Sequence, residues 1–455
     1  MMRILIGAAA SGCGKTTVTC ALLKAFQMRG LSVSSFKCGP DYIDPMFHRE
    51  VVGAPSANLD SFFCEPDALR EILHRGSAGT DIAVIEGVMG YYDGMDSGSS
   101  AYDIAGITQT PAVIVINARG MSESMGALMQ GFLHYREDAR ICGFVFNQLP
   151  VSLTGRAKEL CASLHTHYLG YLPRTDISLE SRNLGLVTAA EVPQLQEKIE
   201  RLGDLAAQHL DLDLLMHLAD CGAQEETARR SAFSGMRITD HEAPVIAVAR
   251  DRAFCFRYPE NLYLLEEAGC RIRYFSPLED EFIPEDADGL YLCGGYPELH
   301  ARRLSENISM RKSIRDAVLG GMPAIAECGG FLYLHQELRM EDGSVWPMAG
   351  ILDAAAFPKR SLQRFGYVTL TAQADNLLCE KGDQIRAHAF HYWDSENPGS
   401  LFNAQKPDGR SWRSGIGSET LYAGFPHLYF PAKPQIAQRF AVQCLHYAKR
   451  GTAVL

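Results

Sequence analysis

The sequence predicts an α/β protein made of two parallel-sheet domains. Three observations lead to this prediction. Strand-like and helix-like segments alternate along both halves of the chain, a phosphate-binding loop joins the first strand to the first helix, and a late cysteine occupies a strand–turn–helix segment. Because 455 residues exceed one ordinary core, we expect a first domain at 1–220, a polar linker at 221–243 and a second domain at 244–450.

The composition is typical of a soluble globular protein, with 47% apolar and 21% charged residues. The net charge of −11 argues against general nucleic-acid binding. No apolar run approaches a membrane span, and the N-terminus runs straight into the phosphate loop, so we expect neither a membrane segment nor a signal peptide. The 13 cysteines are odd in number and never spaced CxxC. This pattern favours reduced thiols in the cytoplasm.

The first strand, Ile4–Ile6, leads into the loop AASGCGKTT, and a helical pattern follows from Val18 to Met28. A Gly-rich turn at a helix start points backbone N–H groups at phosphate oxygens. Lys15 is expected to reach the terminal phosphates and Thr16 to help hold a magnesium ion. The candidate ATP-binding residues are therefore Gly12, Cys13, Gly14, Lys15, Thr16 and Thr17. The usual first glycine of the pattern is replaced by Ala9.

Further apolar runs predict the remaining strands of the first domain, and a helical stretch follows them near Leu195–His217. The predicted strands are Ser32–Phe36, Ile82–Ile85, Val113–Ile116, Ile141–Phe146 and Tyr168–Leu172. Since the carboxyl ends of parallel strands form the ligand-binding edge, Glu86 is expected beside the phosphate loop as a metal ligand. Asp41, Tyr42 and Asp44 follow the second strand and either complete a metal site, orient an acceptor or form an ordinary turn.

The second half carries another α/β pattern and becomes richer in β-structure after about Asp353. Its predicted strands are Val245–Ala249, Ile272–Phe275, Leu290–Cys293, Ala324–Ala326 and Leu421–Phe425, and a helical run from Pro434 to Lys449 ends the pattern.

Cys328 lies in the segment PAIAECGGFL, which reads as a strand, a sharp turn and a helix. This arrangement is typical of a nucleophile elbow, and we expect the helix end to lower the thiol pKa. Backbone N–H groups of Gly295 and Gly329 are candidates for an oxyanion hole. The base is expected to be His388, His391 or His427. A buried structural thiol is the alternative interpretation of Cys328.

Five segments from both halves, in matching order, resemble the cobyrinate amidotransferase family, the amidotransferases of corrin-ring biosynthesis. They are Lys37–His48 (KCGPDYIDPMFH), Val84–Asp93 (VIEGVMGYYD), Val245–Asn261 (VIAVARDRAFCFRYPEN), Gly294–Glu298 (GGYPE) and Glu327–Gly330 (ECGG). The resemblance spans nearly the whole chain. It implies a P-loop, dethiobiotin-synthetase-like domain followed by a class I glutamine amidotransferase domain of flavodoxin-like α/β fold.

Within the family, the match is closest to the branch that amidates the a- and c-acetate side chains of cobyrinic acid. The resemblance thus implies a carbon–nitrogen ligase of cobalamin biosynthesis that uses ATP, Mg²⁺ and ammonia from glutamine, through an acyl phosphate. A corrinoid is the implied partner, and a homodimer is implied by analogy with relatives of the first domain. Because such a substrate carries many carboxylates, Arg119 and Arg182 are candidates to bind it.

Carried over by position, Cys328 matches the glutaminase nucleophile and His427 its partner. Thr16, Asp44 and Glu86 are the implied metal set, and Asp41, Tyr42 and Asp44 are the implied acceptor-binding residues. The chain departs from class I amidotransferases at Tyr429, where a glutamate usually stands two residues after the histidine.

Two other interpretations are open. The first is a sister enzyme, such as hydrogenobyrinate a,c-diamide synthase or cobyric acid synthase, although the run Asp41–Asp44 favours the diamide enzyme. The second is a non-catalytic nucleotide switch related to the partitioning ATPases. Those proteins carry an extra lysine where this chain has Ala10, and they lack a cysteine-elbow domain.

Overall fold

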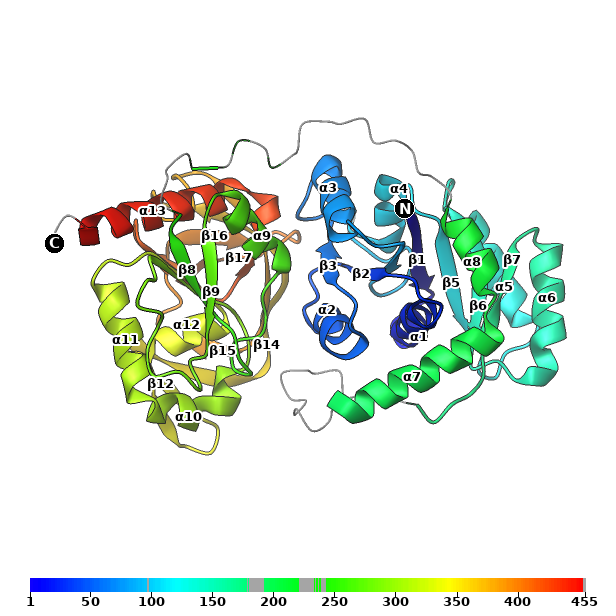
Figure 1. The fold of residues 1–455 in the computed structure, drawn as a ribbon, viewed down its shortest axis with the longest axis horizontal. Helices are drawn as coiled ribbons and strands as arrows, with labels where there is room; N and C mark the ends of the chain where they lie inside the picture. The colour runs from blue at the N-terminus through cyan, green and yellow to red at the C-terminus, as the bar shows by residue number, and fades with distance from the viewer. Residues whose placement is uncertain are drawn as a thin grey trace. The chain divides into compact units, whose positions relative to one another are not determined.

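A computed structural model describes residues 1–95, 98–177, 179, 192–220, 233, 235, 237, 238 and 243–452. The chain forms two compact units, Met1–Ala232 and Phe233–Leu455 (Figure 1). The linker expected at 221–243 lies almost wholly outside the described residues, so its bounds stay a prediction.

The first unit is built on a parallel sheet of seven strands in the order β3-β2-β4-β1-β5-β6-β7. The strands are β1 Met2–Ala8, β2 Val33–Cys38, β3 Ser56–Leu59, β4 Ile82–Glu86, β5 Ala112–Asn117, β6 Ile141–Asn147 and β7 His167–Leu172. This confirms the expected strands and adds β3, whose sequence SANL is too short and polar to signal a strand. Because the strands are buried on both faces, they read as continuous apolar runs.

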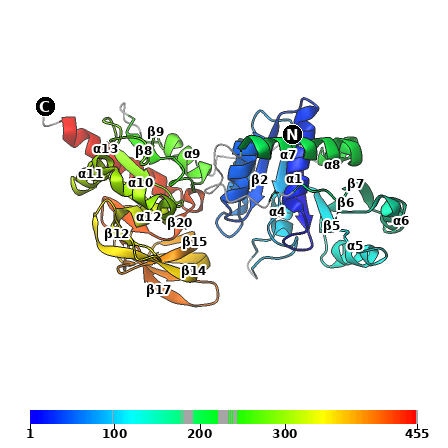
Figure 2. The same cartoon turned by 90° about the horizontal axis from the view of Figure 1, so that it is seen from below.

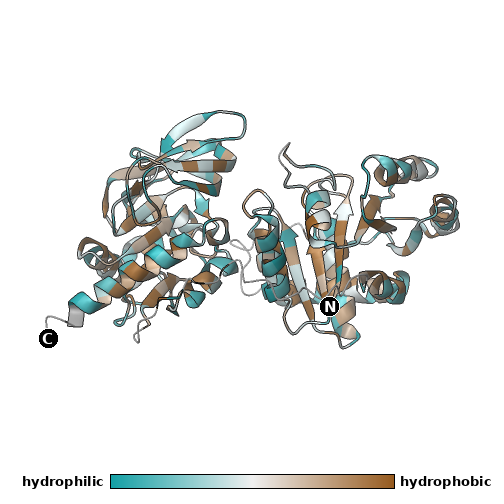
Figure 3. Cartoon of the chain, turned by 90° about the horizontal axis from the view of Figure 1, so that it is seen from above, coloured by the Kyte–Doolittle hydropathy of each residue, from teal (hydrophilic) through white to brown (hydrophobic). Residues whose placement is uncertain are grey.

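Helices cover both faces of this sheet, and the apolar residues concentrate on its strands (Figure 3). On one face, α1 (Lys15–Met28) packs with α7 (Val192–His209) and α8 (Leu212–Ala219) in a core that contains Val18, Leu22 and Phe26. On the opposite face lie α4 (Ala101–Thr108) and α5 (Ser124–His134), as Figure 2 shows. The remaining helical segments are α2 Ile43–Phe47, a π-helix His48–Val52, α3 Pro66–Gly76, a 3₁₀ turn Val151–Leu153 and α6 Thr154–Ser163.

The helical stretch expected near Leu195–His217 is divided in two. Helix α7 ends at His209, and the side chain of Asp211 then accepts a hydrogen bond from the backbone N–H of Leu214, which caps the start of α8. The apolar periodicity continues across the break and therefore conceals it.

The second unit contains a six-stranded sheet in the order β18-β19-β11-β10-β8-β9, parallel except for the edge strand β18. Its strands are β8 Val245–Ala249, β9 Arg271–Phe275, β10 Gly289–Leu292, β11 Ala324–Glu327, β18 Ile416–Gly417 and β19 Leu421–Gly424. Its helical segments are α9 Pro259–Glu267, 3₁₀ turns Pro297–His300 and Phe430–Ala432, α10 Ala301–Glu306, α11 Ile308–Leu319, α12 Gly329–Leu334 and α13 Gln435–Thr452. The predicted strands and the final helix are confirmed.

A second, mainly antiparallel sheet lies in the same unit, where the sequence becomes richer in β-structure. Its strands are β12 His335–Arg339, β13 Val345–Pro347, β14 Leu352–Ala372, β15 Gln384–Ser395, β16 Phe402–Gln405, β17 Ser411–Ser414 and β20 His427–Leu428. Strand β14 spans 21 residues and pairs along most of β15. The last short strand, β20, pairs with β15 and brings His427 opposite His388. Among the described residues, no helix is both long and apolar enough to cross a bilayer.

Candidate active sites

The loop between β1 and α1 depends on glycine at position 14. Gly14 adopts φ 98°, and a Cβ atom there would lie 2.1 Å from Nδ2 of Asn147, at the end of β6. The same Asn147 amide donates a hydrogen bond to the carbonyl oxygen of Cys13 at 3.1 Å. The loop backbone therefore packs directly against the carboxyl edge of the sheet, and only glycine fits at this point.

Lys15 and Thr16 are buried at the start of α1, whereas Gly12 is exposed and Cys13 and Thr17 are half-buried. The Lys15 ammonium donates to the carbonyl oxygens of Ala10 (3.0 Å) and Met89. Burial lowers its pKa from the usual value, and the neighbouring Lys37 adds to this shift. The side chain thus lies across the loop, and its role in binding phosphate stays a prediction.

A buried ion cluster lies beside this loop, with Lys37 at its centre. The Lys37 ammonium donates to Asp44 Oδ2 at 2.6 Å and to Glu86 Oε1 at 2.9 Å, and it lies 4.0 Å from Asp41. The Thr16 hydroxyl donates to the same Glu86 oxygen at 2.5 Å. The structure therefore brings together Thr16, Asp44 and Glu86, the three residues that the resemblance implies as a metal set.

Sheet pairing creates this cluster, because Lys37 on β2 is the register partner of Glu86 on β4. His48 contacts the other Glu86 oxygen at 3.4 Å through Nε2, while its Nδ1 lies 3.1 Å from the Ser35 hydroxyl. Sequence reasoning missed Lys37 and His48 as site residues. The one available signal was their position at the two ends of the KCGPDYIDPMFH segment.

The charges in this cluster shift the pKa values of its members. Burial alone would raise the pKa of Glu86, but the Lys37 ammonium and hydrogen bonds from His48 and Thr16 hold it below its usual range. Burial and the neighbouring Asp44 carboxylate raise the pKa of Asp41 to about 6. Glu86 is therefore ionised at neutral pH, whereas Asp41 gains or loses its proton about one pH unit below neutrality.

Tyr42 is buried just before α2, and the Asp41 carboxylate accepts the backbone N–H of Ile43 at 2.8 Å. Arg119, proposed for substrate binding, is exposed after β5, and Arg182 lies outside the described residues. Over the part of the chain that the structure describes, no group of three or more His, Cys, Asp or Glu side chains is arranged to hold a metal by itself.

In the second unit, Cys328 occupies the sharp turn between β11 and α12. Its φ of 48° is in the left-handed region, as a nucleophile elbow requires. The Cys328 backbone N–H donates to Gly424 on β19 at 2.8 Å, which ties the elbow to the neighbouring strand. The thiol lies 3.9 Å from the carbonyl oxygen of Phe390 on β15. The cysteine is thus presented at the carboxyl edge of the parallel sheet.

The prediction that the helix end lowers the pKa of the Cys328 thiol is wrong. Burial raises the pKa of the thiol, and the nearby Glu298 carboxylate raises it further, whereas the Gly329 N–H lowers it only partly. The physical reason is that burial removes the water that would hydrate the thiolate, and the single hydrogen bond from the Gly329 N–H at the start of α12 does not compensate for this loss. The thiol therefore needs a base to become a nucleophile.

The loop after β10 contacts both the elbow and His427. A Cβ on Gly329 would lie 2.8 Å from the backbone nitrogen of Gly295, and a Cβ on Gly294 would lie 2.4 Å from Cε1 of His427. A Cβ on Gly295 would lie 2.1 Å from the carbonyl oxygen of Ala253. These close approaches require glycine and set the backbones of Gly295 and Gly329, the predicted oxyanion hole, side by side.

Of the three candidate histidines, His427 and His388 face each other on β20 and β15. His391 stacks on Phe425 with ring centroids 3.9 Å apart, and its Nδ1 lies 2.6 Å from the carbonyl oxygen of Trp393. Burial, followed by the charges of His388 and His391, lowers the pKa of His427 to about 3. His427 is therefore neutral at physiological pH, and the low pKa makes its imidazole a weaker base than an exposed histidine.

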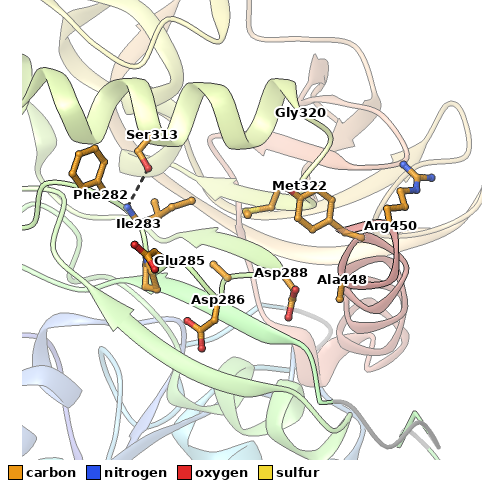
Figure 4. A pocket seen from close by; sticks show the side chains of 13 residues that line it. Phe282, Ile283, Glu285, Asp286, Asp288, Ser313, Gly320, Met322, Ala448 and Arg450 are labelled. Atoms are coloured by element: carbon orange, nitrogen blue, oxygen red, sulfur yellow. Dashed lines mark hydrogen bonds between the residues drawn. The ribbon is translucent and has the colours of Figure 1, made fainter. Parts of the chain in front are cut away.

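A surface pocket of about 790 Å³ also occurs in this unit, lined by residues that include Asp288, Met322 and Tyr447 (Figure 4). Asp288 immediately precedes β10, and Met322 precedes β11. Since Cys328 follows the other end of β11, this pocket lies at the opposite edge of the sheet from the elbow and is not part of that site.

The fold and the two sites define a two-part protein, in which a phosphate-binding unit is joined to a cysteine-elbow unit of amidotransferase type. Residues 4–187 match the CobQ/CobB/MinD/ParA nucleotide binding domain, and residues 245–434 match the CobB/CobQ-like glutamine amidotransferase domain. The chain is a glutamine-dependent amidoligase.

Similar curated proteins include the cobyrinate a,c-diamide synthase of Listeria innocua, 37% identical over 96% of this chain and 98% of the relative. That of Caldanaerobacter subterraneus is 35% identical over 99% of this chain and 100% of the relative. Among solved structures, a chain in PurLQS from Thermotoga maritima covers 45% of this chain and 99% of its own length, at 16% identity and a TM-score of 0.32. From the curated relatives, the chain belongs to the cobyrinate a,c-diamide synthase family.

Proposed function

We propose that this chain converts the a- and c-acetate carboxylates of cobyrinic acid into carboxamides, with ammonia from glutamine and energy from ATP. The observation that carries the proposal is the presence of both sites on one chain that aligns almost end to end with cobyrinate a,c-diamide synthases. A phosphate loop supports activation of a carboxylate, and a cysteine elbow supports release of ammonia from an amide.

In the second unit, Cys328 is proposed as the nucleophile and His427 as its base. Neutral His427 takes the thiol proton, and the sulfur attacks the side-chain amide carbon of glutamine. The N–H groups of Gly295 and Gly329 are proposed to stabilise the oxyanion that forms. Ammonia leaves with the proton from His427, and water hydrolyses the remaining thioester to glutamate.

In the first unit, a carboxylate oxygen of the corrinoid attacks the terminal phosphorus of ATP and ADP leaves. Ammonia then attacks the acyl carbon and phosphate leaves, which gives the carboxamide. Because negative charge accumulates on the phosphoryl oxygens, the Lys15 ammonium and the loop N–H groups from Gly12 to Thr17 stabilise this step. Asp41, Tyr42 and Asp44 are proposed to orient the acceptor carboxylate.

Magnesium fits the donor set of this unit. Thr16, Asp44 and Glu86 offer oxygen atoms, which Mg²⁺ prefers, and the Lys37 ammonium already bridges Asp44 and Glu86 as a cation would. We propose that these three residues hold Mg²⁺. When bound, the ion supplies charge neutralisation at the phosphate oxygens.

We further propose a cytoplasmic homodimer. All twelve cysteines described by the structure are free, which supports a reducing compartment.

Leu128 on α5 and Tyr135 just after it are exposed, which supports a contact between copies of the first unit. Sedimentation analysis of the chain and of a Leu128→Glu variant tests the dimer.

The test of function is incubation of the purified chain with cobyrinic acid, ATP, Mg²⁺ and glutamine, followed by mass spectrometry. We expect two carboxylates, and no more, to become amides. Amidation of further side chains, or a preference for hydrogenobyrinate, would assign the chain to a sister enzyme. ATP hydrolysis without amide formation or glutamine hydrolysis would favour a nucleotide switch.

A further inference from the structure

Three buried polar side chains connect the segment that carries Cys328 to the segment that carries His427. They are Asn261 on α9, Tyr291 on β10 and Glu327 on β11, and each is at most 1% exposed. Glu327 directly precedes Cys328. We call these three residues the Asn261–Tyr291–Glu327 network.

The network is continuous. One N–H of the Asn261 amide donates to the Tyr291 hydroxyl at 3.1 Å, and the Tyr291 hydroxyl donates to Glu327 Oε2 at 3.2 Å. The other Glu327 oxygen, Oε1, accepts the backbone N–H of Leu428 at 3.1 Å. Each member is therefore oriented by the next, and one end of the network is the backbone of the residue that follows His427.

Asn261 holds the same segment from its other side. Its second N–H donates to the carbonyl oxygen of Leu428 at 2.8 Å, and its Oδ1 accepts the backbone N–H of Phe430 at 2.7 Å. The network thus bonds both backbone polar groups of Leu428. Since β20 spans only His427 and Leu428, its two-residue pairing with β15 is a weak anchor by itself.

The chain departs from class I amidotransferases close to its histidine. In class I amidotransferases a glutamate stands two residues after it, but this position is Tyr429, whose ring packs edge-on against Tyr258 with centroids 4.8 Å apart. The network instead supplies polar contacts to the backbone that follows His427, at Leu428 and Phe430.

We propose that Asn261, Tyr291 and Glu327 are positioning residues that fix the place of His427 relative to Cys328 through the backbone of Leu428 and Phe430. This inference rests on the proposed glutaminase role of Cys328 and His427. Because Glu327 is adjacent to Cys328, one carboxyl group fixes both the nucleophile strand and the base strand.

The test uses Glu327→Ala, Glu327→Gln and Tyr291→Phe in the full chain. Gln keeps the oxygen that accepts from Leu428, so it should retain most of the activity. A misplacement of about 1 Å at a reacting group can cost about 100-fold in rate, so Glu327→Ala should lower the kcat of glutamine hydrolysis about 100-fold with little change in KM. Tyr291→Phe should lower kcat less. Amidation driven by free ammonia should be unchanged in all three.

Tyr333→Phe is the matched control, because Tyr333 is equally buried but its hydroxyl belongs to no part of the network. This variant should keep the wild-type kcat. If Tyr333→Phe and Tyr291→Phe lower kcat equally, or if Glu327→Ala leaves kcat unchanged, the proposal is wrong. If the wild-type chain does not hydrolyse glutamine, the proposed function itself fails, which is a separate result.

A double-mutant cycle distinguishes positioning from general structural damage. The rate of Cys328 alkylation by iodoacetamide is measured for the wild type, Glu327→Ala, His427→Ala and the double variant. If Glu327 acts through His427, its loss slows alkylation in the wild-type background but not in His427→Ala. Equal slowing in both backgrounds would overturn the inference. Should Glu327→Ala fail to fold, the same cycle with Tyr291→Phe decides the question.

Discussion

Replacement of Lys37 by Met should strongly destabilise the first unit. Met has a similar length but no charge, so the variant leaves the Asp44 and Glu86 carboxylates without the ammonium that contacts them at 2.6 and 2.9 Å. The Lys37 side chain is 5% exposed and that of Glu86 is 1% exposed, so water cannot take the place of the cation.

The magnitude follows from this burial. Removing one partner of a buried ion pair costs about 3–5 kcal/mol. In a unit of this size, each kcal/mol lowers Tm by about 2–4 °C, so we expect a fall of about 6–20 °C. Scanning calorimetry measures it, with the transition of the second unit as an internal reference.

Lys24→Met is the matched control, since Lys24 forms a solvent-accessible pair with Glu200 at 3.5 Å, in which the two side chains are 25% and 64% exposed. Such pairs contribute about 0–1 kcal/mol. Addition of Glu86→Gln to Lys37→Met should restore part of the lost stability, because it removes the uncompensated charge. If Lys37→Met shifts Tm no more than Lys24→Met does, the reasoning about this cluster is refuted.

Three other predictions concern both sites. Gly14→Ala, which forces a Cβ to 2.1 Å from Asn147, should abolish ATP-dependent amidation but leave glutamine hydrolysis intact; equal ATP affinity in variant and wild type would contradict this. Burial raises the pKa of Glu327 to about 8, above its usual value of about 4.3. The contribution of the protonated Glu327 carboxyl to the free energy of unfolding is therefore complete below about pH 4 and is lost as pH rises through 8. Glu327→Gln should therefore flatten the decline in unfolding free energy between pH 5 and 9, and an unchanged decline would count against the assignment. Since the pKa of His427 is about 3, kcat/KM for glutamine should show no acid limb near pH 6.5; an acid limb with a midpoint near pH 6.5 in the wild type would show that the histidine is not held neutral.

Sequence reasoning identifies the parts of each site that are local in the chain. The phosphate loop and the cysteine elbow follow from residue types at fixed short spacings, because each is one strand–turn–helix segment. Likewise, Glu86 follows from its place at the end of an apolar strand. These features need no knowledge of which strands are neighbours.

The parts that depend on strand order are missed. Lys37 and Glu86 are 49 residues apart and meet only because β2 and β4 are adjacent. Asn261 and Leu428 are 167 residues apart. The pKa of Cys328 was wrongly expected to be low because local sequence reveals the helix end but not the burial of the thiol. Long-range packing therefore determines the charges of both sites.

The most direct test of the two-site account is amide formation on cobyrinic acid by the wild type and by Cys328→Ala, with ATP, Mg²⁺ and either glutamine or free ammonia. The account predicts that the variant loses the glutamine-dependent reaction and keeps the ammonia-dependent one. If Cys328→Ala still uses glutamine, or loses both reactions while remaining folded, the assignment of glutamine hydrolysis to Cys328 and of amidation to a separate site is contradicted.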